Sequence, residues 1–430
     1  MKQVWSKKWH APRAWVAALG VSVGLMGLSG CEETGTTDPA AGDGSATPVA
    51  SAASTPVTEV APLSPASAAS APEPAASVAS EPAAAEAPSA EAQAATQVVS
   101  GPVLAGCPMF PVNAVFNTRI DDLPAHGQSS QWVGAIGASV PFHPDWGTTE
   151  DAYADDYYGI PWNVLDGKAS TTDWPLTSLW WPDESNCGLK QANGSIAVQQ
   201  DCGAVADQAR FPFPKSGWKI EGGYLATNEG DRHVLLVEAG VCRLWETGYA
   251  YPQANGQWEA GGAAMWNLAS NAMRPDNWTS ADAAGLPMLP LLLKVDEAAS
   301  GEIKHALRVT FRNPLMADKV HVWPASHHAG NDGTGTIPFG ALLRLKAGVT
   351  IPANWGTQAK AIAVAMQRYG LYVADNGSNL YVQGEPSVRW DPNLIAQLKT
   401  LKMSDFEFVD TSGITSRAGF DARSYAVPAR

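Results

Sequence analysis

Carboxylates beside tryptophans are the first residues of this sequence that could do chemistry. Glu246 follows Trp245, and Glu259 follows Trp258. Hydrolysis of a glycosidic bond needs one protonated and one ionised carboxyl, and an aromatic face raises a carboxyl pKa and stacks on sugar rings. We therefore expect Glu246 and Glu259 as a catalytic pair on neighbouring strands, with both tryptophans binding sugar. The alternative is that each tryptophan and glutamate are neighbours by chance, with the acids on a solvated face of a sheet.

Histidines offer a second chemistry, because imidazole serves as a general base near neutral pH. His233 lies two residues after Asp231, and His305 falls inside an expected strand. We expect either His233 with Asp231, or His305, in this role. Glu221, Asp231 and Asp276 also belong to the group of carboxylates considered with Glu246 and Glu259. The alternative is that these histidines only bond the backbone.

Three further histidines have metal-ligand spacing. The pattern His321-x₅-His327-His328 can place two imidazoles on one divalent metal ion, with His305 or Asp332 as a third ligand. A divalent metal is thus the candidate cofactor. Metal-dependent hydrolysis is one alternative function.

A polar turn is the third candidate site. Residues 375–379 read Asp-Asn-Gly-Ser-Asn and are followed by Tyr381. Oxygens of Asp375, Asn376 and Asn379 suit Ca²⁺ or sugar hydroxyls, so we expect these residues and Tyr381 to bind ligand. The alternative is a hairpin turn, where Asp, Asn and Gly serve the backbone.

Charge and missing motifs exclude several classes of protein. A formal charge of -14 argues against a nucleic-acid partner, which would require a basic face. The sequence has no P-loop and no G-x-G-x-x-G between a strand and a helix, so we expect no nucleotide. It has no G-x-S-x-G elbow or H-E-x-x-H, which argues against an α/β-hydrolase or a zincin.

Short strands must position these residues. Alternating or apolar runs predict strands over 233–238, 241–249, 257–267, 303–311, 319–323, 340–346, 370–374, 379–383 and 405–410. Helical spacing predicts helices over 358–369 and 391–401, and an interrupted one over 282–294. The sequence predicts a mainly β single domain, a β-sandwich or jelly roll with two or three decorating helices, behind a disordered linker.

The N-terminal hundred residues form two segments. Residues 1–30 combine four basic residues with an apolar run, as in a signal peptide, and Leu28-Ser-Gly-Cys31 resembles a bacterial lipobox. The resemblance implies lipidation of Cys31, a membrane anchor and a cell-envelope location. Glu32 favours the outer membrane. Residues 31–100, rich in Ala, Pro, Ser and Glu, predict a disordered tether before a secreted globular domain over 101–430.

The four remaining cysteines predict disulfides, because an exported protein meets an oxidising compartment. We favour Cys187–Cys202, which closes a short polar loop, and Cys107–Cys242, which ties the start of the domain to its centre. A Cys₄ zinc site is the alternative, although the sequence has no C-x₂-C pair.

The domain resembles an uncharacterised family of secreted bacterial proteins, because seven short sequence segments occur in the same order as in that family. They are 158–163 (YGIPWN), 181–185 (WPDES), 220–223 (IEGG), 230–234 (GDRHV), 258–261 (WEAG), 274–282 (RPDNWTSAD) and 373–379 (VADNGSN). The resemblance implies one exported domain and supplies no activity. We expect a lipid-anchored protein whose domain binds or cleaves extracellular carbohydrate, as a hydrolase, a lyase or a binding module. A structural or interaction protein of the envelope is the alternative.

Overall fold

The structure, a computed structural model, describes residues 101–167, 173–224, 230–330 and 333–429. The chain divides into the units Met1–Ser89 and Ala90–Arg430, and every described residue belongs to the second. The expected signal segment, Cys31 and the tether lie outside the described residues. In the described part, more residues form strands than helices, which confirms the prediction of a mainly β fold. None of the helices described there is long and apolar enough to cross a membrane.

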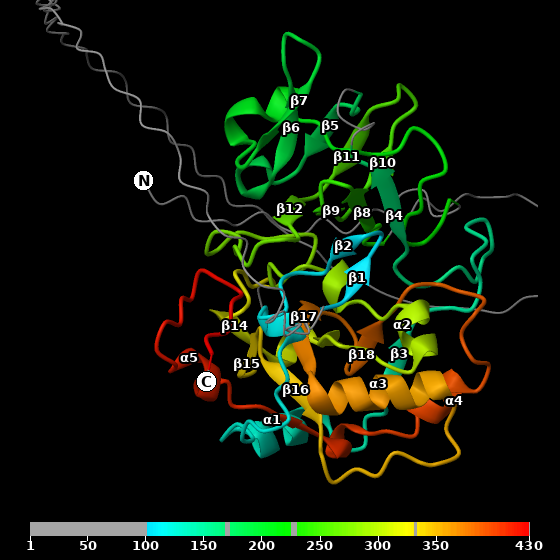
Figure 1. The fold of residues 1–430 in the computed structure, drawn as a ribbon, viewed down its shortest axis with the longest axis vertical. Helices are drawn as coiled ribbons and strands as arrows, with labels where there is room; N and C mark the ends of the chain where they lie inside the picture. Colours follow the sequence, from blue (N-terminus) through cyan, green and yellow to red (C-terminus); the bar gives the residue numbers. More distant parts are fainter. Residues whose placement is uncertain (1–100, 168–172, 225–229, 331–332, 430) are drawn as a thin grey trace, which may run out of the picture. The chain divides into compact units, whose positions relative to one another are not determined.

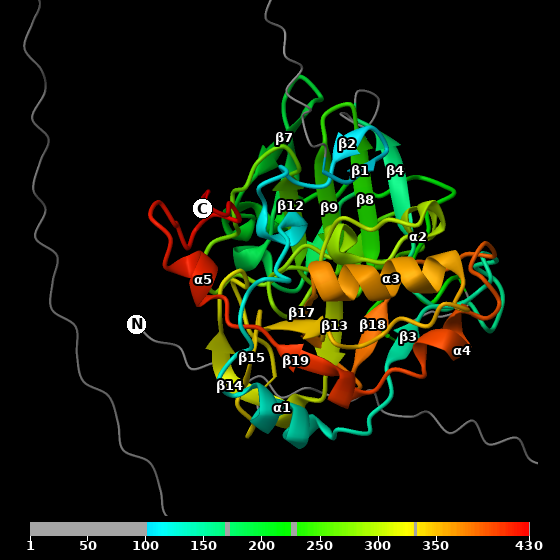
Figure 2. The ribbon, with the colours of Figure 1, turned by 60° about the horizontal axis from the view of Figure 1, so that its bottom comes forward.

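A four-stranded sheet contains the strongest strand signals of the sequence, and Figure 2 shows its strands side by side. The strand order is β12–β9–β8–β4, with the bounds Ala263–Asn267, Arg243–Thr247, Val234–Ala239 and Trp162–Asp166. β8 and β9 form the expected antiparallel pair around Gly240, which adopts a left-handed φ of 82°. Leu235 and Val237 of β8 pack into one core, whereas Val234 and Leu236 pack into another. Burial on both faces explains why β8 reads as a continuous apolar run.

A six-stranded mixed sheet lies under the longest helix (Figure 1). Its order is β19–β16–β17–β13–β18–β3, with the bounds Phe406–Phe408, Leu342–Leu345, Leu371–Asn376, Leu307–Phe311, Tyr381–Gln383 and His143–Asp145. Helix α3 (Thr357–Arg368) packs on β16 and leads into β17, which is parallel to β13. Because β13 lies between β17 and β18, residues 377–380 cross the end of β13. The hairpin alternative for this turn is therefore wrong.

Four smaller sheets complete the strands. They are β1 (Val103–Leu104) with β2 (Cys107–Pro108); β10 (Tyr251–Pro252), β11 (Trp258–Ala260) and β5 (Thr177–Leu179); β6 (Cys187–Lys190) with β7 (Ile196–Gln199); and β14 (Met316–His321) with β15 (Ile337–Phe339). The expected strand 257–267 divides at Gly261 and Gly262, so that β11 and β12 belong to different sheets.

The helices are short apart from α3. The others are α1 (Ser129–Ile136), α2 (Val295–Ser300), α4 (Leu394–Leu398) and α5 (Ser412–Thr415). The interrupted helix over 282–294 forms only the 3-10 turn Leu289–Leu291, because Pro287 and Pro290 lack backbone donors. Parallel pairs occur in both larger sheets, and the finer expectation of a sandwich or jelly roll stays a prediction.

Both predicted disulfides are confirmed. Cys107–Cys242 joins residues 135 positions apart, and Cys187–Cys202 joins residues 15 apart. Cys242 lies directly before β9, so the first disulfide ties the start of the domain to the hairpin of the four-stranded sheet. All four cysteines that the zinc alternative needed are thus in disulfides.

Candidate functional site

Six charged side chains from both larger sheets and the segments beside them interact with one another. We call them the polar centre. Glu221, Asp231 and His233 precede β8, Asp282 follows β12, Arg308 belongs to β13, and Asp375 to β17. Positions far apart in the sequence therefore supply one group of ionisable side chains, the usual composition of a site for acid–base chemistry.

An ion pair between Glu221 and His233 forms one side of the polar centre. Glu221 Oε2 lies 2.6 Å from His233 Nδ1, and the carbonyl oxygen of Ala281 lies 3.0 Å from His233 Nε2. Both ring nitrogens face oxygen acceptors, so the imidazolium fits best. Burial lowers the pKa of His233, but Glu221 outweighs it and the pKa rises to about 9. Burial likewise opposes ionisation of Glu221, and His233 outweighs it, so the pKa of Glu221 falls below its usual value.

Arg308 stands between two carboxyls on the other side. Its Nη2 lies 2.9 Å from Asp282 Oδ1 and 3.8 Å from Asp375 Oδ2. Asp282 is fully buried, whereas the Asp375 side chain keeps 23% of its exposure. Burial, followed by the nearby Asp282, raises the pKa of Asp375 to about 8, and Arg308 only partly opposes this. The protonated form of Asp375 is therefore favoured relative to an ordinary aspartate, and the ionised form of Glu221 relative to an ordinary glutamate.

The polar centre reaches solvent at Asp231, which is exposed. The backbone N–H of Tyr249 donates to the Asp231 carbonyl oxygen at 2.5 Å. Burial raises the pKa of the Tyr249 phenol, and the charges of Asp231 and Asp375 raise it further, so the tyrosine faces both acids. An acid whose pKa is raised by burial, a solvent-exposed acid and two basic side chains here have the composition needed for general acid and base catalysis.

Strained backbone holds this solvent-open edge. Arg232 and Tyr249 adopt left-handed φ values of 48° and 51°, which cost free energy in non-glycine residues. The Arg232 guanidinium donates from Nη1 to the carbonyl oxygens of Gly223 (2.6 Å) and Glu221 (3.4 Å). These contacts join the segment of Glu221 to that of His233. Such strain clusters at functional sites.

Glu246 and Glu259 belong to different sheets and do not form the expected catalytic pair. Glu246 is on β9 of the four-stranded sheet and is fully buried. Its oxygens accept the backbone N–H groups of Met288 (2.9 and 3.1 Å) and Leu289 (2.7 Å). Glu246 thus caps the first turn of the 3-10 segment Leu289–Leu291. Glu259 is on β11 of another sheet, where Oε1 accepts the indole N–H of Trp180 at 2.6 Å.

The two tryptophans expected to bind sugar are core residues instead. Trp245 is fully buried, contacts Trp174 and Phe211 edge-on, and donates its indole N–H to Glu238 at 2.7 Å. Trp258 is 6% exposed and stacks on Phe213 at 3.9 Å between ring centroids. Neither ring has a free face for a ligand.

His305 belongs to a separate buried group. Its Nε2 lies 2.9 Å from Glu297 Oε2, and its Nδ1 lies 2.8 Å from the carbonyl oxygen of Ala306. Lys294 Nζ lies 3.2 Å from the same Glu297 oxygen and donates to the carbonyl oxygen of Leu292 at 2.8 Å. These contacts secure the start of α2, so His305 lacks the solvent-open setting of the polar centre.

The three histidines with the expected metal-ligand spacing form a row of nearly parallel rings. Ring centroids are 5.6 Å apart for His321 and His328, and 5.4 Å for His327 and His328. His321 Nε2 lies 2.9 Å from Asp276 Oδ1, and His327 Nδ1 lies 2.8 Å from the Ala283 carbonyl oxygen. Among the described residues, no group of three or more His, Cys, Asp or Glu side chains is placed to hold a metal. The structure does not support the expected metal site, and Asp332 lies outside the described residues.

Of the polar turn, only Asp375 joins the polar centre through a charged contact. Asn376 donates its backbone N–H to Asp375 Oδ1 at 2.7 Å, and Asn379 Oδ1 accepts the backbone N–H of Arg312 at 3.0 Å. Tyr381 stacks on His143 with centroids 3.8 Å apart. Asn379 therefore binds the backbone, as expected for a polar turn residue, although this turn does not close a hairpin.

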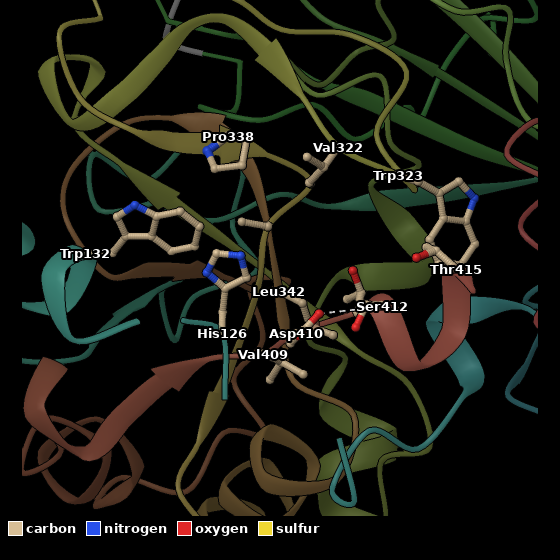
Figure 3. A pocket seen from close by; sticks show the side chains of 13 residues that line it. His126, Trp132, Val322, Trp323, Pro338, Leu342, Val409, Asp410, Ser412 and Thr415 are labelled. Carbon is tan, nitrogen blue, oxygen red and sulfur yellow. Dashed lines mark hydrogen bonds between the residues drawn. The ribbon is translucent and has the colours of Figure 1, made fainter. Parts of the chain in front are cut away.

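A cavity of about 300 Å³ lies among β16, α5 and the residues before α1 (Figure 3). His126 stacks on Trp132, and its Nδ1 accepts the backbone N–H of Gln128 at 3.2 Å. Asp410 Oδ1 accepts the backbone N–H of Ser412 at 2.8 Å. The backbone and the side chain of Ser412 both lower the pKa of Asp410 through hydrogen bonds, and His126 lowers it less. No member of the polar centre lines this cavity.

Sequence reasoning missed Asp282 and Arg308. A signal for Arg308 existed: it is a single cation in Leu307–Phe311, a strand that is otherwise apolar apart from Thr310, and a buried charge requires a partner. Asp282 carried no comparable signal. No match to the chain was found among protein-family models, curated proteins or solved structures.

Proposed function

We propose that the domain cleaves an extracellular carbohydrate by general acid and base catalysis at the polar centre. The observation that carries this proposal is the contrast between carboxyls of one site. Asp375 lies on one side of Arg308 with the buried Asp282 on the other, and its pKa is raised, whereas Glu221 lies 2.6 Å from His233 Nδ1 and its pKa is lowered. Glycoside hydrolysis requires one carboxyl that is protonated and one that is ionised.

In this mechanism Asp375 is the acid and Asp231 the base. Asp375 donates its proton to the glycosidic oxygen as the bond to the departing sugar breaks. Asp231, exposed and on the same side as Tyr249, accepts a proton from the attacking water. Arg308 and His233 are positioning residues, since each pairs with a neighbouring carboxylate. The ionised Asp375 that results is partly compensated by Arg308.

Release of reducing sugar from a panel of polysaccharides tests the proposal. Asp375→Asn and Asp231→Asn should each lower kcat by at least about a hundredfold, the scale of a lost acid or base. Asp318→Asn is the matched control, because Asp318 lies on β14 with its side chain 45% exposed and lies 4.0 Å from Lys319 Nζ, outside the polar centre. Activity that persists in both site variants would refute the assignment.

We also propose that Cys31 is lipidated and anchors the protein to the outer membrane of the cell envelope, with carbohydrate as its partner. The lipobox resemblance and the low-complexity stretch up to residue 100 support this. Cys31→Ala should release the protein into the soluble fraction. Continued membrane fractionation of that variant would contradict the anchor.

A further inference from the structure

A group of one exposed and two partly buried aromatic rings lies beside the polar centre and is not part of it. We call Trp180, Tyr249 and Tyr251 the aromatic platform. Trp180 stacks on Tyr249 with ring centroids 5.0 Å apart and an interplanar angle of 24°, and lies 6.4 Å from Tyr251 at 31°. Trp180 keeps 43% of its exposure, an unusual value for so large an apolar side chain.

The platform is fixed rather than adaptable. Glu259 Oε1 accepts the Trp180 indole N–H at 2.6 Å, and the Trp180 backbone N–H reaches the carbonyl oxygens of Ala260 and Gly261. A Cβ atom at Gly261 would come within 2.8 Å of the Tyr249 ring, so glycine is what lets this ring lie against the backbone there. Rigid aromatic rings bind at a low entropic cost, because few rotamers are lost.

One residue of the platform contacts a member of the polar centre, and a second contacts the residue beside that member. The Tyr249 backbone N–H bonds Asp231, and the Tyr251 hydroxyl donates to the carbonyl oxygen of Gly230 at 3.3 Å. Glu259, which accepts the Trp180 indole N–H, adds a partly exposed carboxylate. Aromatic faces bordered by carboxylates match the chemistry of a sugar, whose C–H face is apolar and whose hydroxyls donate hydrogen bonds.

We propose that the aromatic platform is a binding subsite for a pyranose ring of a neutral or basic polysaccharide whose neighbouring linkage lies at the polar centre. The inference rests on the proposed function, because it names the substrate class of that site. The ring stacks on the exposed face of Trp180, and Glu259 and Asp231 accept its hydroxyl protons. The two carboxylates disfavour acidic glycans through like-charge repulsion.

Binding of glycans to the full-length protein in detergent tests this inference apart from catalysis. All variants carry Asp375→Asn, so that bound glycan is not degraded. The probes are xylan, cellulose oligomers, chitin oligomers and polygalacturonate, followed by affinity electrophoresis or tryptophan fluorescence. Trp180→Ala should weaken binding by at least about tenfold, and Trp180→Phe by less. Tyr153→Ala is the control, because Tyr153 is 66% exposed and packs on Tyr224 outside the platform.

The outcomes separate the subsite from the reaction. Loss of binding in Trp180→Ala but not in Tyr153→Ala supports the subsite. If the chain with Asp375 intact nevertheless fails to cleave the bound glycan, the proposed reaction fails and the subsite stands. Binding that is unchanged in Trp180→Ala, preference for polygalacturonate, or no binding to any probe overturns the subsite.

Discussion

Replacing Asp375 by asparagine should make the protein more stable at alkaline pH and flatten the dependence of its stability on pH. Burial and Asp282 raise the pKa of Asp375 from 3.8 to about 8 in the folded chain. An acid with a raised folded pKa contributes stability below its unfolded pKa, and this stability is lost as the pH rises through the folded pKa. The loss for Asp375 therefore develops between about pH 4 and pH 8.

The expected magnitude follows from the pKa difference and the exposure of the side chain. At about 1.4 kcal/mol for each pKa unit, the rise to about 8 corresponds to somewhat over 5 kcal/mol. The 23% exposure of the side chain screens part of this, which leaves on the order of 4 kcal/mol. At pH 5 somewhat over a quarter of this loss has already developed, so the asparagine variant should be more stable by about 1 kcal/mol. At pH 9 the asparagine variant should be more stable by about that amount.

Urea denaturation at pH 5, 7 and 9, followed by tryptophan fluorescence, measures the difference. Other groups also titrate in this range, but they are common to both proteins and cancel in the comparison. Asp318→Asn, which removes an exposed carboxyl, should follow the wild type at every pH. If Asp375→Asn loses as much stability between pH 5 and pH 9 as the wild type, Asp375 is ionised at neutral pH and cannot be the acid.

Three further changes test other parts of the structure. His233→Gln should destabilise the protein by on the order of 3 kcal/mol near pH 6 and much less at pH 10. The pKa of His233 rises from 6.5 to about 9 on folding, so the imidazolium contributes stability that is lost as the pH rises through 9. Urea denaturation at both pH values measures this difference. Glu246→Ala should cost about 2 to 6 kcal/mol, since two buried N–H donors lose their acceptor, and Glu246→Gln should cost less in the same assay. Replacing Cys107 and Cys242 by serine should cost about 5 kcal/mol of stability, and replacing Cys187 and Cys202, which close a shorter loop, should cost about 3 kcal/mol. Equal losses in thermal or urea denaturation would contradict this dependence on loop length.

Strands were predictable from the sequence because burial leaves a local pattern. Residues 233–238 and 241–249 predicted β8 and β9, since apolar runs bounded by Gly240 have few other interpretations. Sheet membership was not predictable. Gly261 and Gly262 break one apparent strand into β11 and β12, and only long-range pairing decides which sheet each half joins.

The candidate site was predictable in part for a similar reason. His233 with Asp231 was found from local proximity, and Asp375 from its polar turn. Asp282 and Arg308 escaped because their significance lies in a contact between residues 26 positions apart in sequence. Trp245 and Trp258 misled because a tryptophan beside an acid looks the same in a binding site and in a core; in the structure their rings face Phe211 and Phe213.

The energetic cost of the polar centre argues for a role beyond stability. Arg232 and Tyr249 are held in left-handed conformations, and Asp375 lies near a buried acid. Among the described residues, Arg308 Nε is buried without a hydrogen-bond partner. Hydrophobic residues of similar size would remove these costs, since buried ion pairs often stabilise less than apolar packing does. The surrounding fold offsets them: β8 is buried on both faces directly after His233, and the disulfide of Cys242 secures the following turn. A rigid frame around a strained, incompletely paired group of charges is the arrangement that acid and base catalysis requires.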